Sequence, residues 1–171
     1  MGGANTKTGL YFEQDVDLLT SLARKGFVVR ERAVYAYGSP APIAHSYPKT
    51  KLYSEFLEKS GVDHSKILSA RLLPDEALYV PSRKRLHVIE KKYQEKSGSV
   101  DEKLQTCDYK KSQYERLCAS LGVHVTFNYV LNEWFKAPRY VDVLAYIRAR
   151  GCRYYFFEVP LGDLDLPDPP R

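Results

Sequence analysis

The segment from residue 72 to residue 94 constrains the fold more than any other, because two apolar runs flank a short polar stretch. Residues 72–80 and 85–94 have the composition of β-strands, whereas residues 81–84 have that of a turn. The pattern predicts an antiparallel β-hairpin, and the other predicted elements are arranged around it.

Helices and strands alternate along the rest of the chain. Apolar residues at helical spacing, such as Phe12, Val16 and Leu19, predict a helix over residues 9–26, with Thr8 as its cap. The other predicted elements are a strand at 27–32, a short helix at 53–59, a helix from about 99 to 121, a strand at 123–131, a helix at 139–149 and a strand at 152–159. This order predicts an α/β fold, with a central mixed β-sheet flanked by helices.

The length of 171 residues fits a single domain, and a hydrophobic content of 44% suffices for a core. Residues 36–70 are the least regular part, and residues 36–50 have the glycine and prolines of a loop. We interpret residues 36–70 as an insertion that serves recognition. The proline-rich, acidic residues 160–171 are expected to form a tail that follows the surface or frays.

The formal net charge of +5 favours a polyanionic partner such as nucleic acid. Three cysteines without a CxxC pair predict neither a disulfide framework nor a zinc site, and they favour a reducing compartment. The sequence has no run of about 18–20 apolar residues that would span a bilayer, and its first residues lack the apolar core of a signal peptide. We therefore expect a cytoplasmic protein outside the membrane.

The second strand of the hairpin carries the first candidate site residues. Side chains alternate between the two faces of a strand, so Val88, Glu90, Lys92 and Gln94 share one face. That face changes from apolar residues to a carboxylate, an amine and an amide. A rigid strand holds such groups precisely, and we expect Glu90, Lys92 and Gln94 to form part of an active site.

Asp75 begins the first strand, and a hairpin centred between residues 82 and 83 places it opposite Glu90. Side chains paired in this way lie about 5 Å apart, and two carboxylates at that distance repel unless a cation lies between them. Mg²⁺ favours such oxygen ligands, with Mn²⁺ as its substitute. Lys92 would then flank the metal, where it can orient water and stabilise the charge of a phosphate under attack.

These residues resemble the signature of the PD-(D/E)xK nucleases. Pro74 and Asp75 are followed after fourteen residues by Glu90-Lys91-Lys92, and Gln94 extends the match to the ExKxQ form of some restriction-type members. The resemblance covers about residues 9–131, and is concentrated in residues 74–94. It implies a restriction-endonuclease-like fold and Mg²⁺-dependent hydrolysis of double-stranded DNA by a homodimer. It also implies that Glu13, in the first helix, adds a metal ligand.

Two alternatives to a type II restriction-type enzyme remain open at this point. A junction-resolving, repair or homing nuclease would use the same fold and the same motif. A non-catalytic DNA-binding module would bind DNA and cleave nothing. The sequence contains neither of the phosphate-binding motifs GxxxxGK[ST] and GxGxxG, and it has no GxSxG elbow. A Ser-His-Asp triad is left open.

Contacts with DNA are expected from basic and amide side chains. Lysines and arginines near the candidate site suit the phosphates, and Asn and Arg side chains suit base edges. The candidates are Arg83, Lys84, Arg85, Lys96, Lys110, Asn128 and Arg139.

Overall fold

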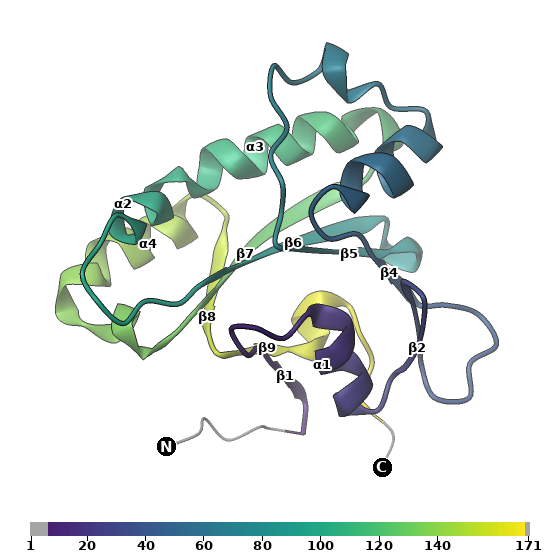
Figure 1. Ribbon diagram of the computed structural model, residues 1–171, viewed down its shortest axis with the longest axis horizontal. Coiled ribbons are helices and arrows are strands. Elements are labelled where there is room, and N and C mark those ends of the chain that lie inside the picture. Colours follow the sequence, from purple (N-terminus) through teal and green to yellow (C-terminus); the bar gives the residue numbers. More distant parts are fainter. Residues whose placement is uncertain (1–6, 170–171) are drawn as a thin grey trace.

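The computed structural model describes residues 7–169, with the backbone alone at residues 100 and 101, and it is built on a seven-stranded mixed sheet. The strands lie side by side in their order along the chain (Figure 1). Strands β2 to β6 form antiparallel pairs, whereas β6, β7 and β8 are parallel. Their bounds are β2 Val28–Arg30, β3 Ala33–Tyr35, β4 Ala44–Ser46, β5 Glu76–Val80, β6 Arg85–Lys92, β7 His124–Leu131 and β8 Arg153–Phe156.

Other parts of the chain cover both faces of the sheet, and a separate hydrophobic core lies against each face. Val88 of β6 points to the larger core, together with residues of α3 (Cys107–Cys118), α4 (Val141–Ala149) and the short π-helix Leu52–Leu57. Ile89 points to the smaller core on the other face, which α1 (Leu18–Lys25) helps to cover. The alternation along β6 therefore decides which core each residue enters.

The two parallel connections carry the helices of the larger core. A parallel pair of strands needs a long crossover, and α3 and α4 supply it between β6, β7 and β8 (Figure 1). The short helix α2 (Val100–Lys103) precedes α3 and is separated from it by a 3-10 turn, so the helix predicted from residue 99 to 121 is interrupted. The prediction of a mixed α/β fold is confirmed at this level.

The predicted helix over residues 9–26 is wrong in its first half. Gly9–Tyr11 forms strand β1, which pairs antiparallel with β9 (Glu158–Pro160) in a separate two-stranded sheet. The helix α1 begins only at Leu18, and Asp17, not Thr8, caps it by accepting a hydrogen bond from the Thr20 N–H at 2.7 Å. Pairing with a strand far along the chain outweighed the local helical spacing.

Two further predictions need correction. The predicted loop 36–50 contains strand β4, which joins the sheet between β3 and β5. The predicted strand 152–159 is divided between β8 and β9, because Phe157 has a φ of 59° that turns the chain from one sheet to the other. The hairpin of β5 and β6 and the strand β7 are confirmed within a few residues. No helix within residues 7–169 is long and apolar enough to cross a bilayer.

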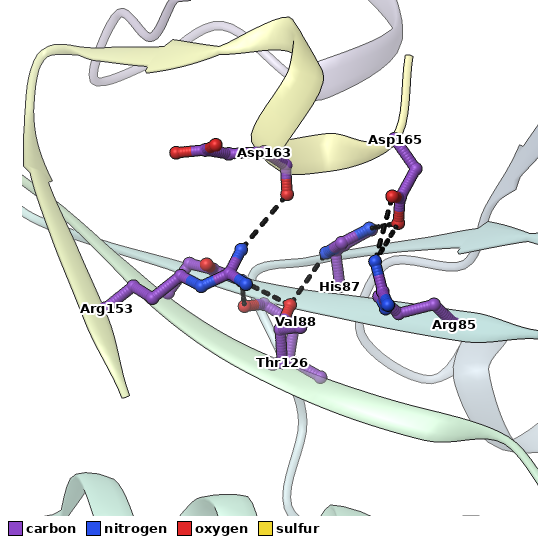
Figure 2. Close-up of polar contacts among 8 residues, drawn as sticks. Arg85, His87, Val88, Thr126, Arg153, Asp163 and Asp165 are labelled. Atoms are coloured by element: carbon purple, nitrogen blue, oxygen red, sulfur yellow. Dashed lines mark hydrogen bonds and ion pairs between the residues drawn. The ribbon is translucent and has the colours of Figure 1, made fainter. Parts of the chain in front are cut away.

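The C-terminal segment is fastened to the smaller-core face of the sheet, as far as residue 169. Asp165 accepts two hydrogen bonds from Arg85, at 2.8 and 2.9 Å, and lies 2.8 Å from Nε2 of the buried His87. Arg153 donates to the backbone carbonyl of Asp163 at 3.2 Å. Figure 2 shows these strand side chains pointing toward the segment. The described part of the predicted tail is therefore packed onto the sheet.

Candidate active site

The hairpin register places the predicted acids at one end of the sheet. The last pair in the register of β5 and β6 joins Glu76 to Ile89, so the next residues outward are Asp75 and Glu90. Because faces alternate, Asp75 belongs with Ala77, and Glu90 belongs with Val88, on the side of the larger core. The structure thus brings the predicted pair to the same face.

Asp75 is held in place by the backbone of the neighbouring strand. It is half-buried, and its Oδ2 accepts a hydrogen bond from the Lys91 N–H at 3.0 Å. The preceding Pro74 is buried, and its carbonyl accepts a hydrogen bond from the Lys49 N–H at 2.9 Å. The first bond holds the carboxyl group itself and the second holds the backbone just before it, so Asp75 has little freedom to turn away.

Glu90 is a buried acid, with 5% of its surface exposed. The Lys92 Nζ lies 3.2 Å from its Oε2. The Lys110 Nζ, from α3, lies 2.9 Å from Oε2 and 3.3 Å from Oε1. A buried carboxylate needs charged partners, and here two ammonium groups share one carboxylate.

Gln94 lies just beyond the end of β6, and its backbone is bound to the side chain of Asn132, the residue after β7. The Asn132 Nδ2 donates to the Gln94 carbonyl at 2.7 Å, and the Gln94 N–H donates to the Asn132 Oδ1 at 3.2 Å. The Gln94 Nε2 donates to the Lys96 carbonyl. The amide is therefore oriented with its oxygen free of these contacts.

Two buried polar atoms in this neighbourhood have no hydrogen-bond partner within the described residues. They are the Gln94 Oε1, in a side chain with 7% exposure, and the Tyr114 hydroxyl, in a side chain with 1% exposure. Burial raises the pKa of Tyr114 far above its ordinary value, and the negative charges of Glu90 and Asp75 raise it further. Buried polar groups normally have partners, so such unpaired atoms indicate a site for water, an ion or a ligand.

The donors at this end of the sheet suit a small hard cation. Among the described residues, no group of three or more His, Cys, Asp or Glu side chains could hold a metal ion. Asp75 and Glu90 offer two carboxylates, and the unpaired Gln94 Oε1 is a further oxygen. Mg²⁺ binds through one or two carboxylates and keeps several waters, so this set fits it, whereas a closed zinc site needs more protein ligands.

Asp75 also lines a cavity of about 460 Å³, together with Glu76 and Lys91, whose side chains belong to the opposite face of the sheet. The Glu76 Oε1 accepts a hydrogen bond from the Leu18 N–H, at the start of α1, at 3.0 Å. Burial raises the pKa of Glu76 to about 7, and the charges of Asp17 and Asp75 add to the shift. The Lys91 Nζ donates to three backbone carbonyls of residues 13–16. Lys91 thus ties down the loop before α1 and lies on the face opposite Glu90.

Glu13 is not placed as the resemblance implied. It lies in the loop between β1 and α1 instead of in a helix, and its carboxylate is exposed. Its Oε1 contacts the Arg24 guanidinium at 3.1 Å. The early start of the predicted helix misplaced this residue, because α1 begins five positions after it.

Four of the seven predicted DNA contacts do not face the candidate site. Asn128 is wrong as a base contact, because its side chain is 0% exposed and donates to the Val88 carbonyl at 3.0 Å. Arg85 is engaged by Asp165. Arg83 and Lys84 are exposed, but they lie at the turn of the hairpin. Glu90 is five positions along β6 from Arg85, which corresponds to about 17 Å.

The remaining predicted contacts lie nearer to the candidate site. Lys110 touches Glu90 directly. Lys96 is exposed just beyond the end of β6. Arg139 is exposed on the segment after β7, with its guanidinium over the rings of Trp134 and Tyr140. Since β6 and β7 are parallel, both segments leave the sheet at the same edge.

Sequence reasoning missed that Lys110 pairs with Glu90 and that Tyr114 lies beside them. Both belong to α3, four residues apart, so they share one face of the helix. The available signal in the sequence was a tyrosine four positions after a lysine, which places both on one face of the predicted helix. The pairing itself depends on how α3 crosses the sheet, which the local pattern does not specify.

A row of polar side chains elsewhere resembles a catalytic triad but has a structural role. The Thr126 Oγ1 lies 2.7 Å from the His87 Nδ1, and the His87 Nε2 lies 2.8 Å from Asp165 (Figure 2). Burial lowers the pKa of His87, although Asp165 opposes this shift. The imidazole is 0% exposed, and Arg85 already engages the carboxylate. The row fastens the C-terminal segment, and no substrate can reach the imidazole.

The chain was compared with models of protein families, with curated proteins and with solved structures. None of the three comparisons found a significant match.

Proposed function

We propose that this protein is a metal-dependent endonuclease of restriction-endonuclease-like fold that hydrolyses double-stranded DNA. One observation carries the proposal: Glu90 and Lys92 touch each other on one face of β6, at the strand end where the register sets Asp75 opposite Glu90. The PD-(D/E)xK pattern requires this convergence. The order of α1, the antiparallel hairpin, α3 and the parallel strand β7 agrees with the mixed sheet that the resemblance implies.

In this proposal Asp75 and Glu90 hold a divalent cation, Mg²⁺ or Mn²⁺, and Gln94 offers its unpaired amide oxygen. The bound ion would supply positive charge at the scissile phosphate. Lys92 contributes a positive charge of its own from the same face, where it orients the attacking water and stabilises the negative charge of the pentacoordinate transition state. The attacking water gives up one proton to solvent as its oxygen bonds to phosphorus, the bond to the leaving oxygen breaks, and that oxygen takes up a proton from solvent.

Binding of the substrate is assigned to basic residues around this edge of the sheet. Lys96 and Arg139 are exposed on segments that leave the sheet beside Glu90, and they suit phosphate contacts. Each chain offers one such site, and cleavage of both strands then calls for a second copy, so a homodimer is part of the proposal. Residues 36–70 remain a proposed recognition region.

A cleavage assay tests the proposal. Purified protein is incubated with supercoiled plasmid, a linear duplex and a four-way junction, in Mg²⁺ or in EDTA, beside Asp75→Ala and Glu90→Gln. We expect cleavage in Mg²⁺ alone, with a loss of at least a hundredfold in both variants. Asp142→Ala removes an exposed acid of α4 and should cleave at the rate of the unmodified protein.

The substrates separate the alternatives. Preference for the linear duplex supports a restriction-type enzyme, whereas preference for the junction supports a resolving or repair enzyme on the same fold. Binding of DNA that is equal in Mg²⁺ and in EDTA, without cleavage of any substrate, would overturn the nuclease and leave a binding module.

A further inference from the structure

Lys110 occupies the position at Glu90 that a cation would need. Its Nζ contacts both carboxylate oxygens, at 2.9 and 3.3 Å, whereas Lys92 contacts Oε2 alone. An ammonium group and a metal ion cannot share the same lone pairs at these distances. A cation that binds both oxygens of Glu90 must therefore displace Lys110 first.

The local charges show why the exchange is feasible. Asp75 and Glu90 carry two negative charges, and Lys92 and Lys110 carry two positive ones. If Lys110 leaves, Glu90 keeps Lys92 as a partner and is not stranded as an unpaired buried charge. A lysine has a long flexible stem and three donors, so it can turn to another acceptor without a change in the helix that carries it.

We propose that Lys110 is a displaceable counter-ion: it holds Glu90 while the site is without metal, gives way to the divalent cation, and then binds a phosphate of the DNA. This inference rests on the proposed function. It adds that metal and substrate are coupled through one side chain of α3. The released ammonium group lies at the place where negative phosphate arrives, and phosphate is the ligand that it suits.

The neighbouring Lys111 provides a matched control. It has the same charge and the same helix, but its Nζ donates to the Gly151 carbonyl at 3.2 Å and lies 3.5 Å from Glu115. It does not contact Glu90 within the described structure. Substitution of Lys111 therefore changes the net charge equally and leaves the carboxylate of Glu90 as it is.

The first measurement is the affinity for Mn²⁺ without DNA, for which electron paramagnetic resonance reports the concentration of free ion. We expect Lys110→Met, and Lys110→Gln as a second variant, to bind Mn²⁺ about tenfold more tightly, because the competing ammonium group is gone. Lys111→Met should stay within twofold of the unmodified protein. Asp75→Ala should lose binding, and thermal melting in EDTA checks that each variant is folded.

The second measurement is the affinity for a DNA duplex in Ca²⁺, by fluorescence anisotropy over a range of salt concentrations. Loss of one phosphate contact should weaken binding by Lys110→Met several-fold and reduce the salt slope by about one. An unchanged or weaker Mn²⁺ affinity in both Lys110 variants would overturn the inference, even if the unmodified protein cleaves DNA. Tighter Mn²⁺ binding without cleavage by any form would instead overturn the nuclease and keep the exchange at Glu90.

Discussion

At the scale of single residues, the two faces of β6 carry charges for different purposes. Glu90 and Lys92 pair on the larger-core face, whereas Lys91 between them donates to backbone carbonyls before α1. A shift of the register by one residue would exchange these faces. The candidate site therefore depends on the pairing of β5 and β6 as much as on the identity of its residues.

Glu76 gives a pH-dependent prediction. Its folded-state pKa of about 7 lies above its ordinary value of 4.5, chiefly because of burial. The stability due to the protonated form is fully present below pH 4.5 and is lost as the pH rises through 7. The shift corresponds to roughly 3 kcal/mol. As the pH rises from 4 to 8, the free energy of unfolding of Glu76→Gln should therefore increase by about 3 kcal/mol relative to that of the unmodified protein.

Urea unfolding of both proteins across that pH range measures this difference. Gln keeps the acceptor for the Leu18 N–H and removes only the ionisation. Asp142→Asn, at an exposed position of α4, is the control and should show no such trend. If the difference in free energy of unfolding between Glu76→Gln and the unmodified protein does not vary with pH, the raised pKa of Glu76 is contradicted.

At the scale of elements, the connection from α3 to β7 sets the position of Lys110 relative to Glu90. The helical segment ends at Gly122, which has a φ of 64° and whose N–H donates to the Ala119 carbonyl at 3.2 Å. An added Cβ would meet nothing within 4 Å, so only the backbone conformation opposes a side chain there. This glycine ends the helix at the point from which β7 can pair with β6.

Gly122→Ala should therefore destabilise the fold by about 1 kcal/mol, the cost of the left-handed conformation for an L-residue. Gly122→Asn should recover part of that loss, because asparagine tolerates this region better. Gly162→Ala is the matched control, since its Cβ also meets open space and its backbone has no such φ. Thermal unfolding compares the three variants. Equal stability of Gly122→Ala and Gly162→Ala would show that the backbone at Gly122 imposes no cost.

Elements with local signals were predictable, and those that depend on distant partners were not. The β5–β6 hairpin is carried by its own alternation and turn, so Asp75, Glu90 and Lys92 fell on the expected face. Strand β1 exists because it pairs with β9, about 150 residues later, and its residues fit a helical spacing equally well. Glu13 was misplaced with it. The burial of Asn128 could not be predicted, because it depends on the sheet's neighbours on both sides.

At the scale of the whole molecule, the first and last described strands, β1 and β9, help to close the smaller core. β1 and β9 pair with each other, and the segment after β9 contributes Leu161 and Leu164 to that core. Asp165 also fastens this segment to Arg85 and His87 of strand β6 (Figure 2). The acidic, proline-rich composition predicted only a surface tail. The packing of this segment was missed because the partners of Asp165 lie about 80 residues earlier in the chain.

The same fastening gives the last prediction. Asp165→Ala would leave the buried His87 without its partner at Nε2 and release the half-buried Arg85. Loss of a buried acceptor for these donors should cost about 2–3 kcal/mol, less than for a wholly buried ion pair because Arg85 is in part solvated. The segment should also become sensitive to proteases, since its contacts with the centre of the sheet are lost. Asp168→Ala, an exposed acid three residues later, should change neither urea unfolding nor proteolysis. Similar behaviour of the two variants would mean that Leu161 and Leu164 alone hold the segment, and that the hydrogen bonds between Asp165, His87 and Thr126 add no stability.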